Sequence, residues 1–258
     1  AEELAVAPHH LIDIIEPTAA YSAAQFAEDA TRLIADINSR GCLPVLVGGT
    51  MLYVKSLLEP LSKLPQGDAE VRGNIDQRAL QIGWPALHEE LARIDAATSA
   101  RLLPHDAQRI SRALEIFHLT GRTMSELIAE QSDAPPELPF TPHLTAIIPE
   151  PRAILHGRIN ARFVNMLADG FLDEMHTLRA RGDLDASMTA MRCVGYRQAW
   201  EYLDGLCSYD EFVEKGQAAT RQLAKRQLTW LRSSKNLNTF SESTALIDFL
   251  KQAARAVD

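Results

Sequence analysis

The fold class is decided by residues 22–58, which read SAAQFAEDATRLIADINSRGCLPVLVGGTMLYVKSLL. Ser22 opens a capping box with the glutamine three residues on, and apolar residues then recur every three or four positions until Gly41, which predicts a helix. Leu43–Val47 is a short apolar run that predicts a buried strand, and Met51–Leu58 returns to helical spacing. Helix, strand, glycine turn and helix in this order are typical of a parallel α/β sheet.

Two further apolar runs, Leu11–Ile15 and Leu144–Ile148, also predict strands. Between residues 61 and 142 the pattern is helical, and the proline-rich stretch Ser132–Pro142 is typical of a linker. After residue 151 the chain is expected to be nearly all helix. The predicted helices are Trp84–Ile94, Asp106–Leu119, Arg152–Leu167, Phe171–Arg181, Val194–Leu203 and a long one from Ser208 to about Arg232.

The composition is that of a globular protein. Of the 258 residues, 46% are hydrophobic and 23% charged, and no apolar run reaches the roughly 18 residues of a membrane-spanning helix. Three separated cysteines without a CxxC pair argue against a disulfide framework or a zinc ribbon, and no secretory signal opens the chain, so we expect a cytoplasmic protein. We expect an α/β core that starts in residues 1–60, a helical insertion in 61–142, and a mostly helical continuation of the core in 143–258.

The net charge is −8, but basic residues gather in one segment. Between Lys215 and Lys235 there are six lysines and arginines and no acidic residue. Since salt screens charges beyond about 10 Å at 0.1 M, such a segment can bind nucleic acid even in an acidic protein. A solvated helix face is the alternative explanation.

Four other motifs suit contacts to phosphate or RNA. Gly48-Gly49-Thr50 follows a predicted parallel strand, where α/β proteins place ligands. Gln108–Arg112 puts two arginines on one helix face, and Arg158 with Arg162 can clamp a diphosphate. Arg192–Arg197 combines two arginines, a glycine and a tyrosine, which suits unstacked RNA bases. The alternatives are a tight turn, exposed helix arginines and a surface pair.

The residues by themselves do not define a reaction. The chain has no G-x-x-x-x-G-K-[ST], G-x-G-x-x-G, G-x-S-x-G or H-E-x-x-H motif. His9, His10 and Asp13 are a poor metal site, because adjacent residues of a strand point to opposite faces.

Taken together and in order, these motifs resemble the tRNA dimethylallyltransferases, which are the bacterial isopentenyl-tRNA transferases. The likeness covers almost the whole chain. The residues that carry it are Pro8–Ile14, Tyr21–Ala23, Leu46–Thr50 with Leu52 and Tyr53, Gln108–Arg112, Arg158, Ile159, Arg162, Phe163, Gly170, Phe171, Arg192–Arg197 and Arg221–Arg232.

The resemblance implies transfer of the dimethylallyl group from dimethylallyl diphosphate to N6 of adenosine 37 in tRNA, with release of diphosphate and with Mg²⁺. It also implies a nucleotide-binding core like that of P-loop hydrolases, with a helical insertion that grips the anticodon stem-loop. By the same resemblance Thr50 is a catalytic residue, and Arg162, with its neighbour Arg158, binds the diphosphate. The residues implied to contact tRNA are Thr50, Arg72, Gln108, Arg109, Ile110, Ser111, Arg112, Arg192, Cys193, Val194, Gly195, Tyr196, Arg197, Lys225, Arg226, Gln227, Leu228, Thr229, Trp230, Leu231 and Arg232.

Family members begin with a strand, a Gly-Pro-Thr-x-x-Gly-Lys-[ST] phosphate loop and an Asp-Ser segment whose aspartate is the expected general base. Neither motif occurs here, so we expect both to lie before Ala1. A protein without them is expected to bind RNA weakly and to turn over nothing.

Two other functions stay open on the residues alone. An adenylate isopentenyltransferase would act on free AMP or ATP and would need neither the insertion nor the basic surfaces. A non-catalytic RNA-binding module would need the surfaces only. No membrane and no protein partner is implied.

Overall fold

The structure, a computed structural model, describes residues 7–59, 64–130, 138–234 and 236–255. Helices dominate these ranges, and one small parallel sheet is present in them. No helix in the described ranges has the length and apolar character needed to cross a bilayer.

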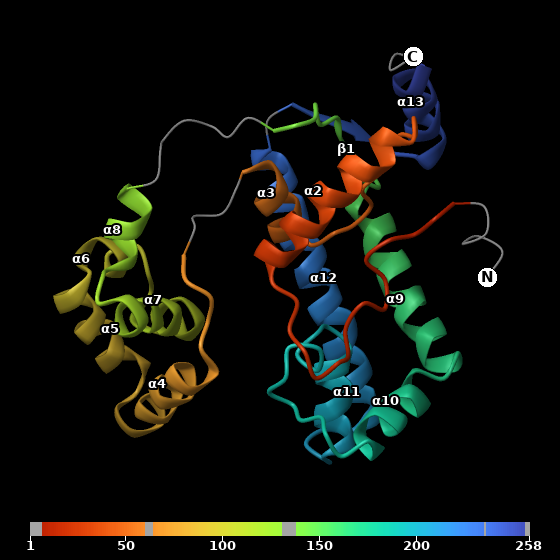
Figure 1. Ribbon diagram of the computed structural model, residues 1–258. Helices are drawn as coiled ribbons and strands as arrows, with labels where there is room; N and C mark the ends of the chain where they lie inside the picture. The colour runs from red at the N-terminus through yellow and green to blue at the C-terminus, as the bar shows by residue number, and fades with distance from the viewer. Residues whose placement is uncertain (1–6, 60–63, 131–137, 235, 256–258) are drawn as a thin grey trace. The chain divides into compact units, whose positions relative to one another are not determined.

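The chain forms two compact units, which Figure 1 shows with their elements. The αβ unit comprises Ala1–Leu58 and Pro139–Asp258, and the helical unit comprises Glu59–Leu138. The chain therefore leaves the αβ unit once and returns to it.

The helical unit is built from helices whose ends are capped by side chains. Asp106 accepts a hydrogen bond from the Arg109 amide at the start of α7, and Gly121, with φ of 69°, ends that helix. Thr123 and Glu126 form a capping box at the start of α8. The helices are α4 (Ala69–Ile82), α5 (Trp84–Ile94), α6 (Ala96–Ser99), α7 (Ala107–Thr120) and α8 (Met124–Ala129). Their buried core consists of Ile75, Ala79, Leu87, Leu91, Ile110, Ala113 and Leu114.

In the αβ unit, α2 (Ala23–Ser39) packs against α3 (Met51–Leu58). The Phe26 ring stacks on the Tyr53 ring with centroids 4.6 Å apart, and Ser56 donates a hydrogen bond to the Ala23 carbonyl. The predicted capping box at the start of α2 is present. Local sequence signals therefore define both helices.

The sheet has two parallel strands, β1 (Leu144–Ile147) and β2 (Leu237–Phe240), which pair in register from Leu144 with Leu237 to Ile147 with Phe240. Helix α13 (Ser243–Arg255) follows β2, and its Phe249 contacts Phe240. The sheet thus joins the segment after the helical unit to the carboxyl-terminal part of the chain.

A second core lies among α9 (Arg152–Ala168), α10 (Phe171–Ala180), α11 (Tyr196–Leu203) and α12 (Tyr209–Ser233). These helices agree with their predicted ranges to within one or two residues. The buried members of this aromatic core are Phe163, Phe171, Met175, Leu184, Met191, Ala199 and Phe212.

Two of the three predicted strands are wrong. Leu11–Ile15 and Leu43–Val47 form no strand in the structure, and the latter is open to solvent, with Val47 87% exposed. A strand needs a neighbour for its backbone hydrogen bonds, and in the described residues β1 and β2 pair only with each other. Leu144–Ile148 is confirmed as β1, so the α/β class holds with a smaller sheet than expected. Most of the predicted linker Ser132–Pro142 lies outside the described residues.

Candidate nucleic-acid interface

The Gly48-Gly49-Thr50 turn contacts the basic part of α12, although the two are far apart in sequence. Gln227 on α12 donates a 2.8 Å hydrogen bond from Nε2 to the Gly49 carbonyl. A Cβ atom at Gly49 would overlap that Nε2 atom, so only glycine allows this contact without a shift of the side chain. Thr50 follows at the start of α3, where its carbonyl accepts from the Tyr53 amide. The structure therefore brings together two of the predicted tRNA-binding segments.

The Arg192–Arg197 loop leads into α11 in the αβ unit. Gly195, with φ of 99° and ψ of −62°, begins α11 in a conformation that side-chain-bearing residues rarely adopt. Its amide donates to the Gln198 side chain at 2.8 Å.

Tyr196 is held by the protein itself. Its ring stacks on Phe171 with centroids 5.6 Å apart, and its hydroxyl donates to Glu174. Burial and the hydrogen bond to Glu174 raise the pKa of Tyr196 to about 12. The ring therefore anchors the loop, while Arg192 and Arg197 are exposed and make no ion pair within the described chain.

The carboxyl-terminal half of α12 presents its charges to solvent. Lys225, Arg226 and Arg232 are exposed and have no hydrogen-bonded or ionic side-chain partner among the described residues. The intervening Gln227, Leu228, Trp230 and Leu231 are partly buried, as expected for the inner side of the helix, and Thr229 is exposed. Unpaired cations at fixed spacing on a helix are free to meet phosphates.

Arg158 and Arg162 stand on the exposed side of α9. Ile159 and Phe163, one position after each, are buried and fix that side of the helix. Neither arginine has an ion pair or hydrogen bond within the part of the chain that the structure describes. Their guanidinium groups are therefore available for a ligand.

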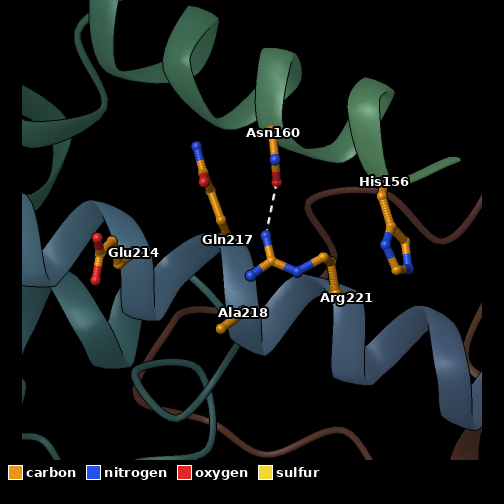
Figure 2. Close-up of a pocket in the computed structure, with 6 residues that line it drawn as sticks. All are labelled: His156, Asn160, Glu214, Gln217, Ala218 and Arg221. Atoms are coloured by element: carbon orange, nitrogen blue, oxygen red, sulfur yellow. Dashed lines mark hydrogen bonds between the residues drawn. The ribbon is translucent and has the colours of Figure 1, made fainter. Parts of the chain in front are cut away.

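A pocket of about 540 Å³ lies between α9 and α12 and was not foreseen from the sequence. Figure 2 shows Arg221 reaching from α12 to Asn160 on α9, and the Nη1–Oδ1 distance is 2.7 Å. The remaining lining residues are His156, Glu214, Gln217 and Ala218. From the sequence, Arg221 is only one of the basic residues of this segment. Its hydrogen bond to Asn160 could not be predicted, because the two residues lie 61 positions apart.

In the helical unit, the Gln108–Arg112 segment is divided between surface and core. Gln108 and Arg109 are exposed, and Arg109 pairs with Asp106 at 3.0 Å. Ile110 is fully enclosed in the core, and Ser111 is buried with no partner for its hydroxyl in the described structure. The side chain of Ile110 therefore supports the helix rather than facing solvent.

Arg72 and Arg112 meet at one buried carboxylate, that of Glu115. Arg72 lies 3.0 Å and Arg112 2.6 Å from its oxygens, and the Asp68 amide donates to it at 2.8 Å. Burial alone would raise the pKa of Glu115, but the hydrogen bonds from Arg112 and Asp68 and the charge of Arg72 hold it below its ordinary value. Glu115 is therefore ionised at neutral pH, and it forms ion pairs with two residues that are predicted to bind tRNA, Arg72 and Arg112. Nothing in the sequence distinguishes Glu115 from a solvent-exposed glutamate on a helix, so its burial could not be predicted.

No metal centre is formed by the described residues, since none of their His, Cys, Asp and Glu side chains gather in groups of three or more. His9, His10 and Asp13 accordingly make no such cluster.

Comparison with known proteins identifies the family. Residues 1–234 match the family model described as IPP transferase. The chain belongs to this family. Among the relatives of this IPP transferase chain, the tRNA dimethylallyltransferase of Chromobacterium violaceum is 59% identical over 234 residues, which are 90% of this chain and 71% of that protein. The tRNA dimethylallyltransferase of Cupriavidus taiwanensis is 52% identical over 260 residues, covering 100% of this chain and 80% of its own length.

Solved structures agree with the family. The tRNA isopentenylpyrophosphate transferase of Bacillus halodurans is 32% identical, with a TM-score of 0.65, and the match covers 100% of this chain and 82% of that one. A eukaryotic dimethylallyltransferase acting on tRNA, at 24% identity and a TM-score of 0.67 over 87% of this chain and 56% of that one, shares the fold. The predicted family and the P-loop-like α/β fold class of this IPP transferase are thus confirmed.

Proposed function

We propose that the protein carrying this sequence transfers the dimethylallyl group of dimethylallyl diphosphate to N6 of adenosine 37 in tRNA, releasing diphosphate, in the cytoplasm. The observation that carries the proposal is the IPP transferase match over residues 1–234. Relatives named tRNA dimethylallyltransferase, 52–59% identical, support it. The contact between the glycine turn and α12 agrees with it, because it joins two segments that the resemblance assigns to tRNA binding.

The departing diphosphate is assigned to Arg162 and Arg158. Cleavage of the allylic carbon–oxygen bond leaves positive charge on the prenyl group and negative charge on the diphosphate, which must be stabilised as it develops. Guanidinium groups stay charged and bind phosphate through two hydrogen bonds at once. Both arginines are exposed and free of ion pairs in the described structure, so neither must break a contact first.

Mg²⁺ is the expected companion of the diphosphate in this reaction. When bound, such an ion would neutralise phosphate charge. The described residues offer no group of three or more His, Cys, Asp and Glu that fits it, so no step is assigned to the ion.

The acceptor adenine is assigned to the surface around Thr50. N6 of adenine is a weak nucleophile inside a stacked loop, so the base must be extruded and must lose a proton as it attacks. Thr50 is exposed at the start of α3, where its hydroxyl can hydrogen-bond the extruded base. Arg192, Arg197 and the cations of α12 would hold the surrounding phosphates.

In the helical unit, Arg72, Gln108 and Arg109 are the exposed residues assigned to the anticodon stem-loop. Arg72 and Arg109 each keep part of the guanidinium exposed, and phosphate contacts of this kind position an RNA without reading its sequence. This unit would grip the substrate, while the αβ unit carries the chemistry.

Labelled dimethylallyl diphosphate offered with three acceptors tests the proposal on the intact protein. We expect label on an anticodon stem-loop with A37, and none on the same loop with G37 or on AMP. Transfer to AMP but not to the A37 loop would favour an adenylate isopentenyltransferase, and RNA binding without any transfer would favour a non-catalytic module.

Arg162→Ala tests the diphosphate assignment. We expect KM for dimethylallyl diphosphate to rise at least tenfold, since a hydrogen bond to a charged group contributes about 1.5–3 kcal/mol. Arg40→Ala is the control, because Arg40 is exposed in the same unit and pairs only with Asp36. Equal constants for the two variants would remove Arg162 from the diphosphate site.

A further inference from the structure

Glu115 is the most deeply buried charged side chain among the described residues, with no exposed surface. It accepts from the Asp68 amide at 2.8 Å, from Arg72 at 3.0 and 3.3 Å, and from Arg112 at 2.6 Å. Its two oxygens are therefore fully used by donors that come from α7, from α4 and from the turn before α4.

The two arginines on this carboxylate are held differently. Arg112 donates to Glu115 through Nη1 and to the Pro65 carbonyl through Nη2, and its side chain is 30% exposed. Arg72 uses only Nη2 for Glu115 and is 53% exposed. Within the described structure Nε and Nη1 of Arg72 have no partner, so one edge of its guanidinium faces outward and is unused.

We propose that Glu115 and Arg112 are positioning residues that hold Arg72, whose free edge binds one backbone phosphate of the tRNA. This inference rests on the proposed function and deepens it, because it separates the contact from its support. Arg72 touches the RNA, while Arg112, expected from the resemblance to contact tRNA, acts through Glu115.

A role in stability alone does not explain this arrangement. Burying a carboxylate and a guanidinium costs solvation that their attraction only partly returns, and an apolar residue of similar size is often as stable. A guanidinium fixed before binding loses less side-chain freedom when a phosphate arrives. Two arginines on one glutamate also leave a net charge of +1, which matches one phosphodiester.

Gly67 gives a way to move Arg72 without changing any charge. A Cβ atom at Gly67 would overlap Nη2 of Arg72 and lie 3.1 Å from Oε1 of Glu115. Gly67 does not have a positive φ, so its backbone accepts alanine. The end of the arginine side chain is the flexible part, so Gly67→Ala would push Arg72 off the carboxylate, while Arg112 and the Asp68 amide would still donate to Glu115.

Gly73→Ala is the matched control, because Gly73 lies within α4 and an added Cβ there meets nothing within 4 Å. Binding of an anticodon stem-loop is measured at several salt concentrations for the wild type, Arg72→Ala, Gly67→Ala, Glu115→Gln and Gly73→Ala. Losing one phosphate contact should weaken binding roughly tenfold and lower the salt slope by about one.

We expect Arg72→Ala, Gly67→Ala and Glu115→Gln to share this loss of affinity and this lower salt slope, and Gly73→Ala to bind like the wild type. Adding Gly67→Ala to Arg72→Ala should cause no further loss. If Arg72→Ala weakens binding and Gly67→Ala does not, the positioning role is wrong. If Arg72→Ala binds like the wild type, the phosphate contact is wrong as well. A wild type that binds no stem-loop would contradict the proposed function itself.

Discussion

Helices α9 and α12 cross where Gly216 faces the ring of Phe163. A Cβ atom at Gly216 would lie 2.6 Å from Cε2 and 2.9 Å from Cε1 of that ring, and closer still to Cζ. Phe163 is 4% exposed, and its ring contacts the rings of Phe171 and Phe212 at 6.4 and 5.7 Å between centroids. The ring cannot turn away without disturbing both neighbours, so Gly216→Ala forces the helices apart.

The size of the effect follows from two opposing terms. Alanine is better than glycine inside a helix by about 1 kcal/mol. Overpacking a well-filled core costs about 1–3 kcal/mol, and an overlap this deep belongs at the upper end. We therefore expect Gly216→Ala to lower the free energy of unfolding by about 2 kcal/mol.

Urea unfolding followed by circular dichroism measures this change. Gly157→Ala is the control, because Gly157 lies within α9 and an added Cβ there has nothing within 4 Å. That variant should gain up to about 1 kcal/mol from helix propensity alone. If Gly216→Ala is as stable as Gly157→Ala, the close crossing of the two helices is refuted.

Three further outcomes are expected. Gly49→Ala should displace the Gln227 side-chain amide and reduce transfer to tRNA severalfold, whereas Gly48→Ala, which has open space at its Cβ, should keep the wild-type activity. Equal activities of the two variants would show that the contact between the turn and α12 plays no part in transfer. Tyr196→Phe keeps the ring stacked on Phe171 but loses the hydrogen bond to Glu174 of α10. We expect its affinity for tRNA to fall and its free energy of unfolding to drop by about 1 kcal/mol. An unchanged tRNA affinity would contradict the role of Tyr196 as the anchor of the Arg192–Arg197 loop. Burial opposes ionisation of Asp95, but the Thr98 and Ser125 amides hold its pKa below the ordinary 3.8, so its contribution to stability is present above that pH and is lost on further acidification. Hydrogen exchange at those two amides, in α6 and α8, should lose this acid dependence in Asp95→Asn, and an unchanged profile would argue against it.

Most of the helices could be predicted because their signals are local. The predicted capping box at Ser22 involves residues only three positions apart and is present, and boxes of the same spacing begin α8 at Thr123 and α12 at Ser208. The predicted strand Leu43–Val47 fails for the opposite reason. An apolar run indicates that a segment is suited to burial. A strand also requires a neighbouring strand to pair with, and the composition of the run does not show whether that neighbour is present.

The candidate site shows the same division. The unpaired arginines at 158 and 162 could be found from their spacing on one helix. The pairing of Arg72 with Glu115 could not, because 43 residues separate them and either looks like an ordinary surface charge in the sequence. The resemblance implies that Ile110 contacts tRNA together with its basic neighbours. The apolar face of α7 instead explains why Ile110 is buried in the core.

Helix α12 is a single rod of 25 residues with its two halves in different surroundings. Gly216 sits in the aromatic core, and Gln227, 11 residues later, touches the glycine turn about 16 Å farther along the axis. A tilt of about 5° at the core would move that end by roughly 1.4 Å over this length, enough to break a hydrogen bond. Substitutions in the aromatic core around Phe163 and Phe212 should therefore change the affinity for RNA even where the protein stays folded. Residues of this core are then constrained by tRNA binding as well as by stability.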